Sequence, residues 1–130
     1  MPATYVDSSA IIKLVAKEPE SAALRRYLRR RRPLVSSALA RTELLRALLP
    51  FGDIAVAAGR RVLLRIELAR INVRVLSTAA TLRPLELRSL DAIHLATAGQ
   101  FGDEIAQLVT YDKRLADAAE QLGHRVVMPS

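Results

Sequence analysis

Short apolar segments alternate with amphipathic segments along the chain, and this alternation limits the possible folds more than any other feature. The first pair sets the pattern: residues 4–6 favour a strand, Asp7 ends the apolar run, and residues 8–14 have helical spacing. Ser8 or Ser9 is expected to cap that helix. Asp7 is therefore expected at the carboxyl end of a buried strand, at the edge where open α/β sheets bind ligands.

The rest of the chain repeats this order of strand and helix. Further strands are predicted at residues 34–35, 73–76, 107–110 and 124–128, and further helices at 20–32, 38–49, 53–70, 77–82, 90–98 and 113–122. This order predicts an α/β fold, a three-layer α/β/α sandwich with a central, mostly parallel sheet. With 130 residues, 51% of them hydrophobic, the chain is expected to form a single domain over residues 1–130.

The amino-acid composition excludes several classes of protein. The chain has no Cys, which excludes a disulfide framework and a zinc site built from thiolates. No apolar run approaches the roughly 20 residues that a membrane span needs, so no membrane association is expected. The first residues lack the layout of a signal peptide, and a cytoplasmic protein is the expectation.

The net charge of +7, from 20 Lys and Arg against 13 Asp and Glu, favours polyanionic partners such as nucleic acid or an acidic protein. The sharpest basic feature is the arginine-rich run at residues 25–32. It either follows RNA phosphates or forms a solvated helix face, and a diffuse electrostatic role is favoured. Only Tyr27 interrupts the run with an aromatic ring, so base stacking is not indicated.

Four acids stand apart from those on ordinary polar helix faces. Asp7 and Asp112 each follow a predicted strand directly, Asp91 lies in the first turn of an otherwise apolar helix, and Glu43 lies in the helix after the second strand. In a parallel sheet the carboxyl ends of the strands share one edge, so these four side chains can converge. The alternative is four separate helix caps or first-turn acids, each favoured by the helix dipole.

Converging carboxylates repel one another and resist desolvation, so such a cluster normally binds a cation. With oxygen ligands only, Mg²⁺ or Mn²⁺ fits best, and neither of the 2 His residues has metal-ligand spacing. A carboxylate-bound Mg²⁺ activates water and binds phosphate oxygens. The reaction that fits these residues in a basic protein is hydrolysis of a phosphodiester.

Four motifs around these acids resemble the PIN-domain family, and within it the VapC-like toxins of toxin–antitoxin pairs. In chain order they read YVDSSAIIKL, ARTELLRAL, SLDAIHLATA and LVTYDKRLADAA. The resemblance implies a metal-dependent endoribonuclease that leaves a 5′-phosphate. It implies Mg²⁺ or Mn²⁺ at Asp7, Glu43 and Asp91, with Asp112 as the fourth acid. It also implies a homodimer, an RNA substrate and a cognate antitoxin, which we expect to occupy the acidic edge.

Three neighbours of the acids have open assignments. Thr110 either orients a carboxylate or bound water, or is an ordinary β-branched strand residue. Ser8 is expected to cap its helix and can also touch the site. His94, one turn after Asp91, is interpreted as a buried packing residue rather than a general base.

Two other functions compete with the nuclease. One is a phosphoryl-transfer or receiver-type α/β domain, in which the Asp after the first strand accepts a phosphoryl group. That reading expects a second acid beside Asp7, where this chain has Ser8, and it leaves Asp91 and Asp112 unexplained. The other is a non-catalytic interaction protein with the PIN fold, against which the presence of all four acids argues.

Overall fold

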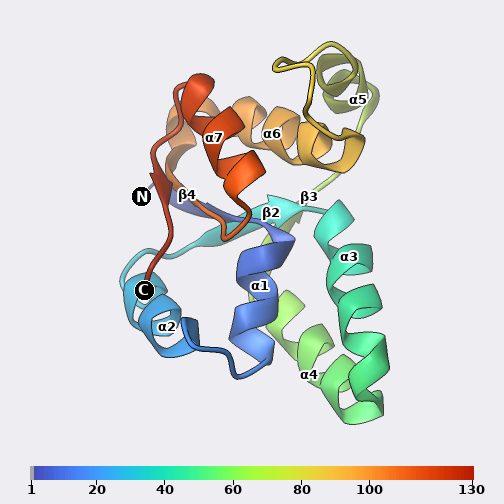
Figure 1. Ribbon diagram of the computed structural model, residues 1–130, viewed down its shortest axis with the longest axis vertical. Helices are drawn as coiled ribbons and strands as arrows, with labels where there is room; N and C mark the ends of the chain where they lie inside the picture. Colours follow the sequence, from blue (N-terminus) through green and yellow to red (C-terminus); the bar gives the residue numbers. More distant parts are fainter. Residues whose placement is uncertain (1) are drawn as a thin grey trace.

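Five parallel strands form one sheet in the computed structural model, which describes residues 2–130 (Figure 1). The strands are β1 (Ala3–Val6), β2 (Leu34–Ser37), β3 (Ile66–Ala69), β4 (Ile105–Val109) and β5 (Val126–Val127). Their order across the sheet is β3-β2-β1-β4-β5, and every neighbouring pair is parallel. The predicted α/β fold with a central parallel sheet is confirmed.

Helices cover both faces of this sheet. They are α1 (Ser8–Val15), α2 (Ser21–Leu28), α3 (Leu39–Leu48), α4 (Asp53–Leu63), α5 (Val73–Ala80), α6 (Ser89–Phe101) and α7 (Lys113–Gln121). Helices α1 to α4 lie below the sheet in Figure 1, α6 and α7 lie above it, and α5 packs against α6. Within residues 2–130, no helix combines the length and the apolar character required to cross a membrane.

Strand β1 lies at the centre of the sheet and contributes to both halves of the core. Val6 packs with residues of α1 to α4, whereas Tyr5 packs with residues of α6 and α7. Successive side chains of a strand point to opposite faces, so a central strand with helices on both sides is buried throughout. All of Ala3–Val6 is buried, which fixes the place where the strand ends and Asp7 begins.

The structure corrects the sequence prediction in the middle of the chain. The helix predicted at residues 53–70 ends at Leu63, and Ile66–Ala69 forms strand β3 along the outer side of β2. The strand predicted at 73–76 is instead the first half of α5. Asn72 explains the second error, because its side-chain oxygen accepts a hydrogen bond from the Val75 N–H at 2.9 Å and caps that helix.

Two predicted helix caps are also wrong. The cap of α1 is Asp7 rather than Ser8 or Ser9, because the Asp7 carboxylate accepts the Ala10 N–H at 3.0 Å. The sequence also favours Ser89 as the cap of the helix predicted at 90–98, but α6 begins at Ser89 itself and its cap position is Arg88. The first correction bears on function, because the acid that ends β1 also starts α1 and is held in place by it.

Candidate active site

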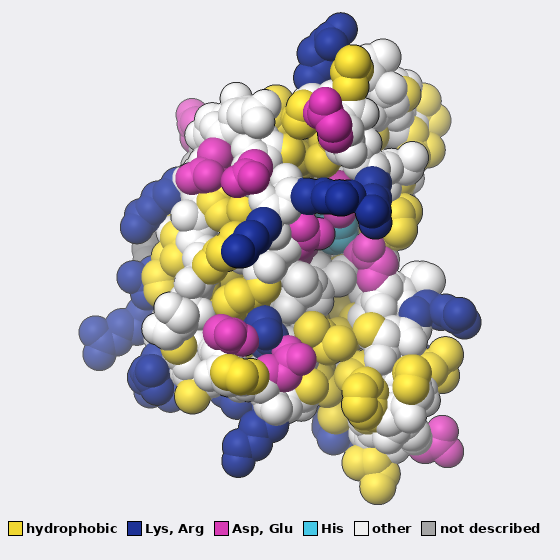
Figure 2. Space-filling model, viewed as in Figure 1, with side chains coloured by type: hydrophobic (Ala, Val, Ile, Leu, Met, Phe, Trp, Pro, Cys, Tyr) yellow, Lys and Arg dark blue, Asp and Glu magenta, His cyan; other side chains and the backbone are white. Residues whose placement is uncertain are grey.

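The fold places Asp7, Glu43, Asp91 and Asp112, here called the edge acids, around the carboxyl edge of the sheet. Asp7 follows β1 and Asp112 lies just beyond β4, while Glu43 and Asp91 lie near the amino ends of α3 and α6. Their charges interact, because Asp112 and Glu43 both raise the pKa of Asp91. Figure 2 shows acidic side chains gathered around a partly covered histidine on this part of the surface.

Asp7 is a buried carboxylate whose two oxygens are both hydrogen-bonded. Oδ1 accepts bonds from the Ser9 hydroxyl at 2.7 Å and the Ala10 N–H at 3.0 Å. Oδ2 accepts a bond from the Thr110 hydroxyl at 2.6 Å. Burial raises the pKa of Asp7 above its usual value, although the bonds from Thr110 and Ser9 oppose the shift. The orientation of this carboxylate is therefore fixed by three donors.

Thr110 and Ser9 also join the loop after β4 to the loop after β1. The Thr110 hydroxyl oxygen accepts a bond from the Asp112 N–H at 3.0 Å, and the Ser9 hydroxyl oxygen accepts one from the Tyr111 N–H at 2.9 Å. This crosslink positions the backbone of Asp112 next to the loop that carries Asp7. Sequence reasoning missed Ser9 as part of this network, because its partners are about a hundred residues away and no local pattern indicates them.

Glu43 is held on one of its oxygens from two sides. Its Oε1 accepts hydrogen bonds from the Ser8 hydroxyl and from His94 Nε2, the latter at 2.7 Å. Burial alone would raise the pKa of Glu43, but the bonds from His94 and Ser8 outweigh it and lower the pKa. The lowered pKa favours the ionised carboxylate. Both bonds end on Oε1, so Oε2 stays available.

Asp91 and Asp112 complete the set and are less buried. Burial is the largest cause of the raised pKa of Asp91, followed by the charge of Asp112. Asp112 Oδ1 accepts the N–H groups of Arg114 at 2.9 Å and Leu115 at 3.3 Å and so caps α7. Asp7 and Asp112 are therefore helix caps that also lie at the acidic edge, so the two interpretations of the sequence are compatible.

His94 is 3% exposed, as the sequence predicts for a packing residue of an apolar helix. Its Nε2 bonds to Glu43, and its Nδ1 lies 2.7 Å from the hydroxyl of Tyr5 in the buried strand β1. Sequence reasoning found neither bond, since Glu43 and Tyr5 lie 51 and 89 residues away. With both nitrogens engaged and almost no exposed surface, the ring is unsuited to proton exchange with a substrate.

The chemistry of the edge acids fits a hard divalent cation, because all of their donor atoms are carboxylate oxygens. Among residues 2–130, no Lys or Arg forms an ion pair with an edge acid, and His94 contacts Glu43 through the hydrogen bond described above. As these side chains lie, no three His, Asp or Glu residues of the described chain form a group that could hold a metal ion. Binding an ion therefore requires side-chain movement, which the partly exposed Asp91 and Asp112 permit.

The arginine-rich run lies away from the acidic edge. Four arginines line a hollow of about 270 Å³, here called the arginine hollow: Arg25, Arg29, Arg32 and Arg65. Leu34 and Ile66, the first residues of β2 and β3, also line it and place it at the amino edge of the sheet. Its other walls are aliphatic, so the hollow is basic at its rim and apolar inside.

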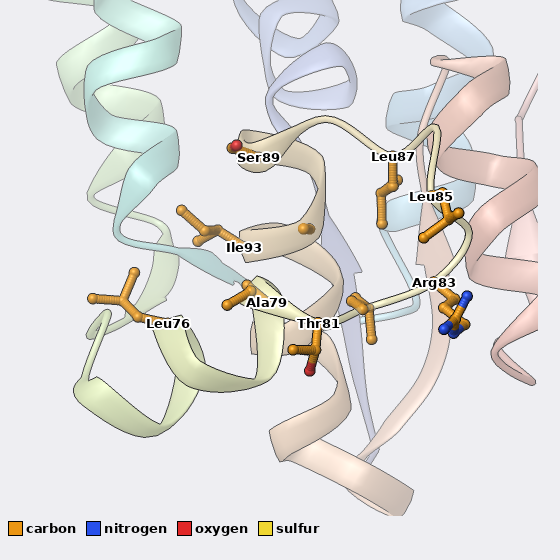
Figure 3. Close-up of a pocket in the computed structure, with 11 residues that line it drawn as sticks. Leu76, Ala79, Thr81, Arg83, Leu85, Leu87, Ser89 and Ile93 are labelled. Atoms are coloured by element: carbon orange, nitrogen blue, oxygen red, sulfur yellow. The ribbon is translucent and has the colours of Figure 1, made fainter.

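A larger hollow, of about 490 Å³, lies between α5, α6 and the segment that connects them (Figure 3). Leu76, Leu85 and Ile93 line it, and it contains no Asp or Glu side chain. Nearby aliphatic side chains are exposed to an unusual degree, with Val73 at 78% and Leu85 at 80%. This face is an apolar surface distinct from the edge acids.

Comparison with known proteins gives concordant results. The PIN-domain family model matches residues 4–121. Ribonuclease VapC46 of Mycobacterium tuberculosis is 58% identical over 130 residues, which cover 100% of both chains. The crystal structure of VapC20 of Mycobacterium tuberculosis, a toxin that cleaves the sarcin–ricin loop, covers 98% of this chain and 100% of its own with a TM-score of 0.79 and 18% identity. A toxin–antitoxin complex from Klebsiella pneumoniae matches with a TM-score of 0.77 and 22% identity over 98% of both chains.

Proposed function

Since the chain belongs to the PIN-domain family and is a VapC ribonuclease toxin of a toxin–antitoxin system, we propose that it hydrolyses RNA phosphodiester bonds with Mg²⁺ or Mn²⁺ at the edge acids. The observation that carries the metal is the mutual repulsion at Asp91, whose pKa is raised by burial and by the charges of Asp112 and Glu43. No Lys or Arg of residues 2–130 forms an ion pair with these acids. A divalent cation supplies the missing charge.

The edge acids have different parts in this proposal. Asp7, fixed by its three donors, is the rigid ligand, and Glu43 offers Oε2 from an ionised carboxylate. Asp91 and Asp112, which are partly exposed, supply the remaining carboxylate ligands. When bound, the ion lowers the pKa of a water and neutralises charge on the scissile phosphate. Thr110 and Ser8 support the site by holding the carboxylates of Asp7 and Glu43.

The partners are proposed on similar grounds. The complex from Klebsiella pneumoniae pairs a toxin with an antitoxin, and we propose a cognate antitoxin for this chain that places a basic side chain among the edge acids. We also propose a homodimer, as the family resemblance implies. The exposed Val73 and Leu85 support a second copy covering the face beside the hollow of Figure 3.

A cleavage assay tests the proposed metal. End-labelled RNA is incubated with purified toxin in excess chelator and again after Mg²⁺ or Mn²⁺ is restored, and the ends of the products are mapped. Cleavage is expected only with the metal present and should leave 5′-phosphates. Asp117→Asn, at an exposed acid of α7, is the matched control and should cleave like the wild type. Undiminished cleavage in excess chelator would overturn the metal proposal.

A further inference from the structure

A chain of hydrogen bonds runs from the centre of the sheet to Glu43. The hydroxyl of Tyr5 lies 2.7 Å from His94 Nδ1, and His94 Nε2 lies 2.7 Å from Glu43 Oε1. Tyr5 is fully buried in β1 and His94 is 3% exposed on α6, so the bond between them is shielded from water, while the bond to Glu43 is part-buried. Three separate elements, β1, α6 and α3, are thus connected through one imidazole ring.

The hydrogen-bond partners on either side of the His94 ring define where its proton lies. A carboxylate oxygen accepts hydrogen bonds, so the bond to Oε1 places a proton on His94 Nε2. In a neutral ring Nδ1 is then an acceptor, and the Tyr5 hydroxyl is the donor that reaches it. Tyr5 therefore favours the tautomer that binds Glu43.

The second bond to Glu43 makes the geometry specific. Ser8, from α1, donates to the same oxygen, Oε1, that accepts from His94 of α6. Two donors from different helices to one oxygen restrict the orientation of the carboxylate and leave Oε2 free of both bonds. In metal sites, residues that hold a ligand in this way commonly change affinity about 10–100-fold when removed.

We propose that His94 and Tyr5 are positioning residues that hold the Glu43 carboxylate in its metal-binding orientation, with Tyr5 selecting the Nε2–H tautomer of His94. This inference rests on the proposed function only where it makes Glu43 a metal ligand. A purely structural role, in which the T-shaped contact of the two rings merely packs α6 on β1, predicts no effect on metal affinity in a folded variant.

The tautomer is tested without metal. Nitrogen-15 NMR of the histidine rings distinguishes Nε2–H from Nδ1–H, and the chain has only 2 His residues, so His124→Gln assigns the signals. The wild type in chelator is expected to show His94 as Nε2–H. Tyr5→Phe keeps the ring shape but removes the donor, and it should introduce a population of Nδ1–H. A wild-type His94 protonated on Nδ1, whether alone or together with Nε2, would overturn the assignment.

The positioning role is tested by titration calorimetry with Mn²⁺ alone. His94→Leu is expected to weaken binding about 10–100-fold, whereas His94→Gln, whose amide N–H can still reach Glu43, should stay within a few-fold of the wild type. His124→Leu is the matched control and should bind like the wild type. Thermal melts show whether each variant is folded, and Tyr5→Phe, expected to weaken binding by several-fold, replaces His94→Leu if that variant unfolds.

The results separate this inference from its premise. A folded His94→Leu that binds Mn²⁺ as tightly as the wild type overturns the positioning role while leaving the metal site intact. Equally weakened binding in the Leu and Gln variants also overturns it, because it indicates a structural defect rather than the removal of a donor. A wild type that binds no Mn²⁺ overturns the proposed metal site and with it the metal-binding part of the role, although the NMR spectrum still decides the tautomer.

Discussion

The two edges of the sheet concentrate opposite charges in different physical settings. At the carboxyl edge, the edge acids are buried or partly exposed, and Asp7 and Glu43 are held by bonds from Ser9, Thr110 and His94. At the amino edge, the arginines of the arginine hollow are exposed. Figure 2 shows Lys and Arg side chains extending outward at the periphery of the molecule.

The comparison shows which cluster requires a functional explanation. Exposed arginines are well solvated, so gathering them costs the fold little and by itself indicates no ligand. Burial disfavours ionised carboxylates and raises the pKa of both Asp7 and Asp91, and at Asp91 the charges of Asp112 and Glu43 raise it further. The acidic edge therefore carries the stronger argument for a site.

The largest expected effect follows from neutralising Asp91. Asp91→Asn should reduce RNA cleavage by more than about 100-fold, since replacing even residues that only support metal ligands commonly costs 10–100-fold. Without metal the variant should be as stable as the wild type or more stable at neutral pH. The gain is at most about 1 kcal/mol and is reduced by solvent screening, because the side chain is partly exposed.

The sign of this stability change follows from the direction in which the pKa of Asp91 is shifted. A carboxyl group with a raised folded pKa destabilises the fold when ionised, and this penalty disappears as pH falls below its unfolded pKa. The gain in Asp91→Asn should therefore fade in acid and vanish with saturating Mg²⁺, which stabilises only the intact cluster. Thermal melts of the wild type and Asp91→Asn, in chelator and in Mg²⁺, measure this difference in stability. A decrease of about 0.3–1 kcal/mol in chelator would instead indicate a first-turn acid that acts only on the helix dipole.

The next effect concerns the bond that holds Asp7. Thr110→Val keeps the shape of the side chain but removes the donor to Oδ2, and it should cost roughly 1.5–3 kcal/mol of unfolding free energy near neutral pH. Since the bond favours ionised Asp7, the cost should shrink as pH falls through the folded pKa of that acid. Thr97→Val is the matched control, a buried threonine bonded to the Ile93 carbonyl, whose cost should not depend on pH.

Glu43 should show the opposite pH dependence from Asp91. Its pKa is lowered, so its ionised form contributes stability that is present above the unfolded pKa and is lost as pH falls through the folded pKa. Glu43→Gln should therefore lower stability at neutral pH, by less than about 1 kcal/mol for this partly exposed group, and match the wild type in acid. Urea unfolding at several pH values measures this, and a variant more stable than the wild type at pH 7 would contradict the role of His94 and Ser8.

Much of the fold was predictable because it depends on local order. Residues 4–6 are β-branched or aromatic and favour a strand, and Asp7 follows at once, so its place at the carboxyl edge needs no tertiary information. The same holds for Asp112, which lies just beyond β4. The roles of the edge acids as metal ligands stay predictions.

The errors arose where tertiary contacts decide. Residues 66–69 include Glu, Leu and Ala, which favour helix, and no Gly or Pro separates them from α4, yet pairing with β2 makes them a strand. Conversely, 73–76 alternates like a strand, but the cap at Asn72 and packing on α6 make it helical. The bonds of His94 to Tyr5 and Glu43 join residues far apart in sequence, so no local pattern could reveal them.

The smallest expected effect tests the basic edge. Arg29 and Arg30 are exposed, so replacing both by Gln should change the free energy of unfolding by less than about 0.5 kcal/mol. If they follow RNA phosphates, affinity should fall and the slope of log K against log salt should shrink by roughly 0.7 for each phosphate that is no longer neutralised, as for single strands. Cleavage sites should not move, because phosphate contacts position the RNA without reading its sequence.

Fluorescence-anisotropy titrations of the Asp91→Asn protein, with and without the two replacements, measure the slope without cleavage. An unchanged slope would assign these arginines to a solvated helix face, and a changed cleavage pattern would mean that the basic edge helps to select the target.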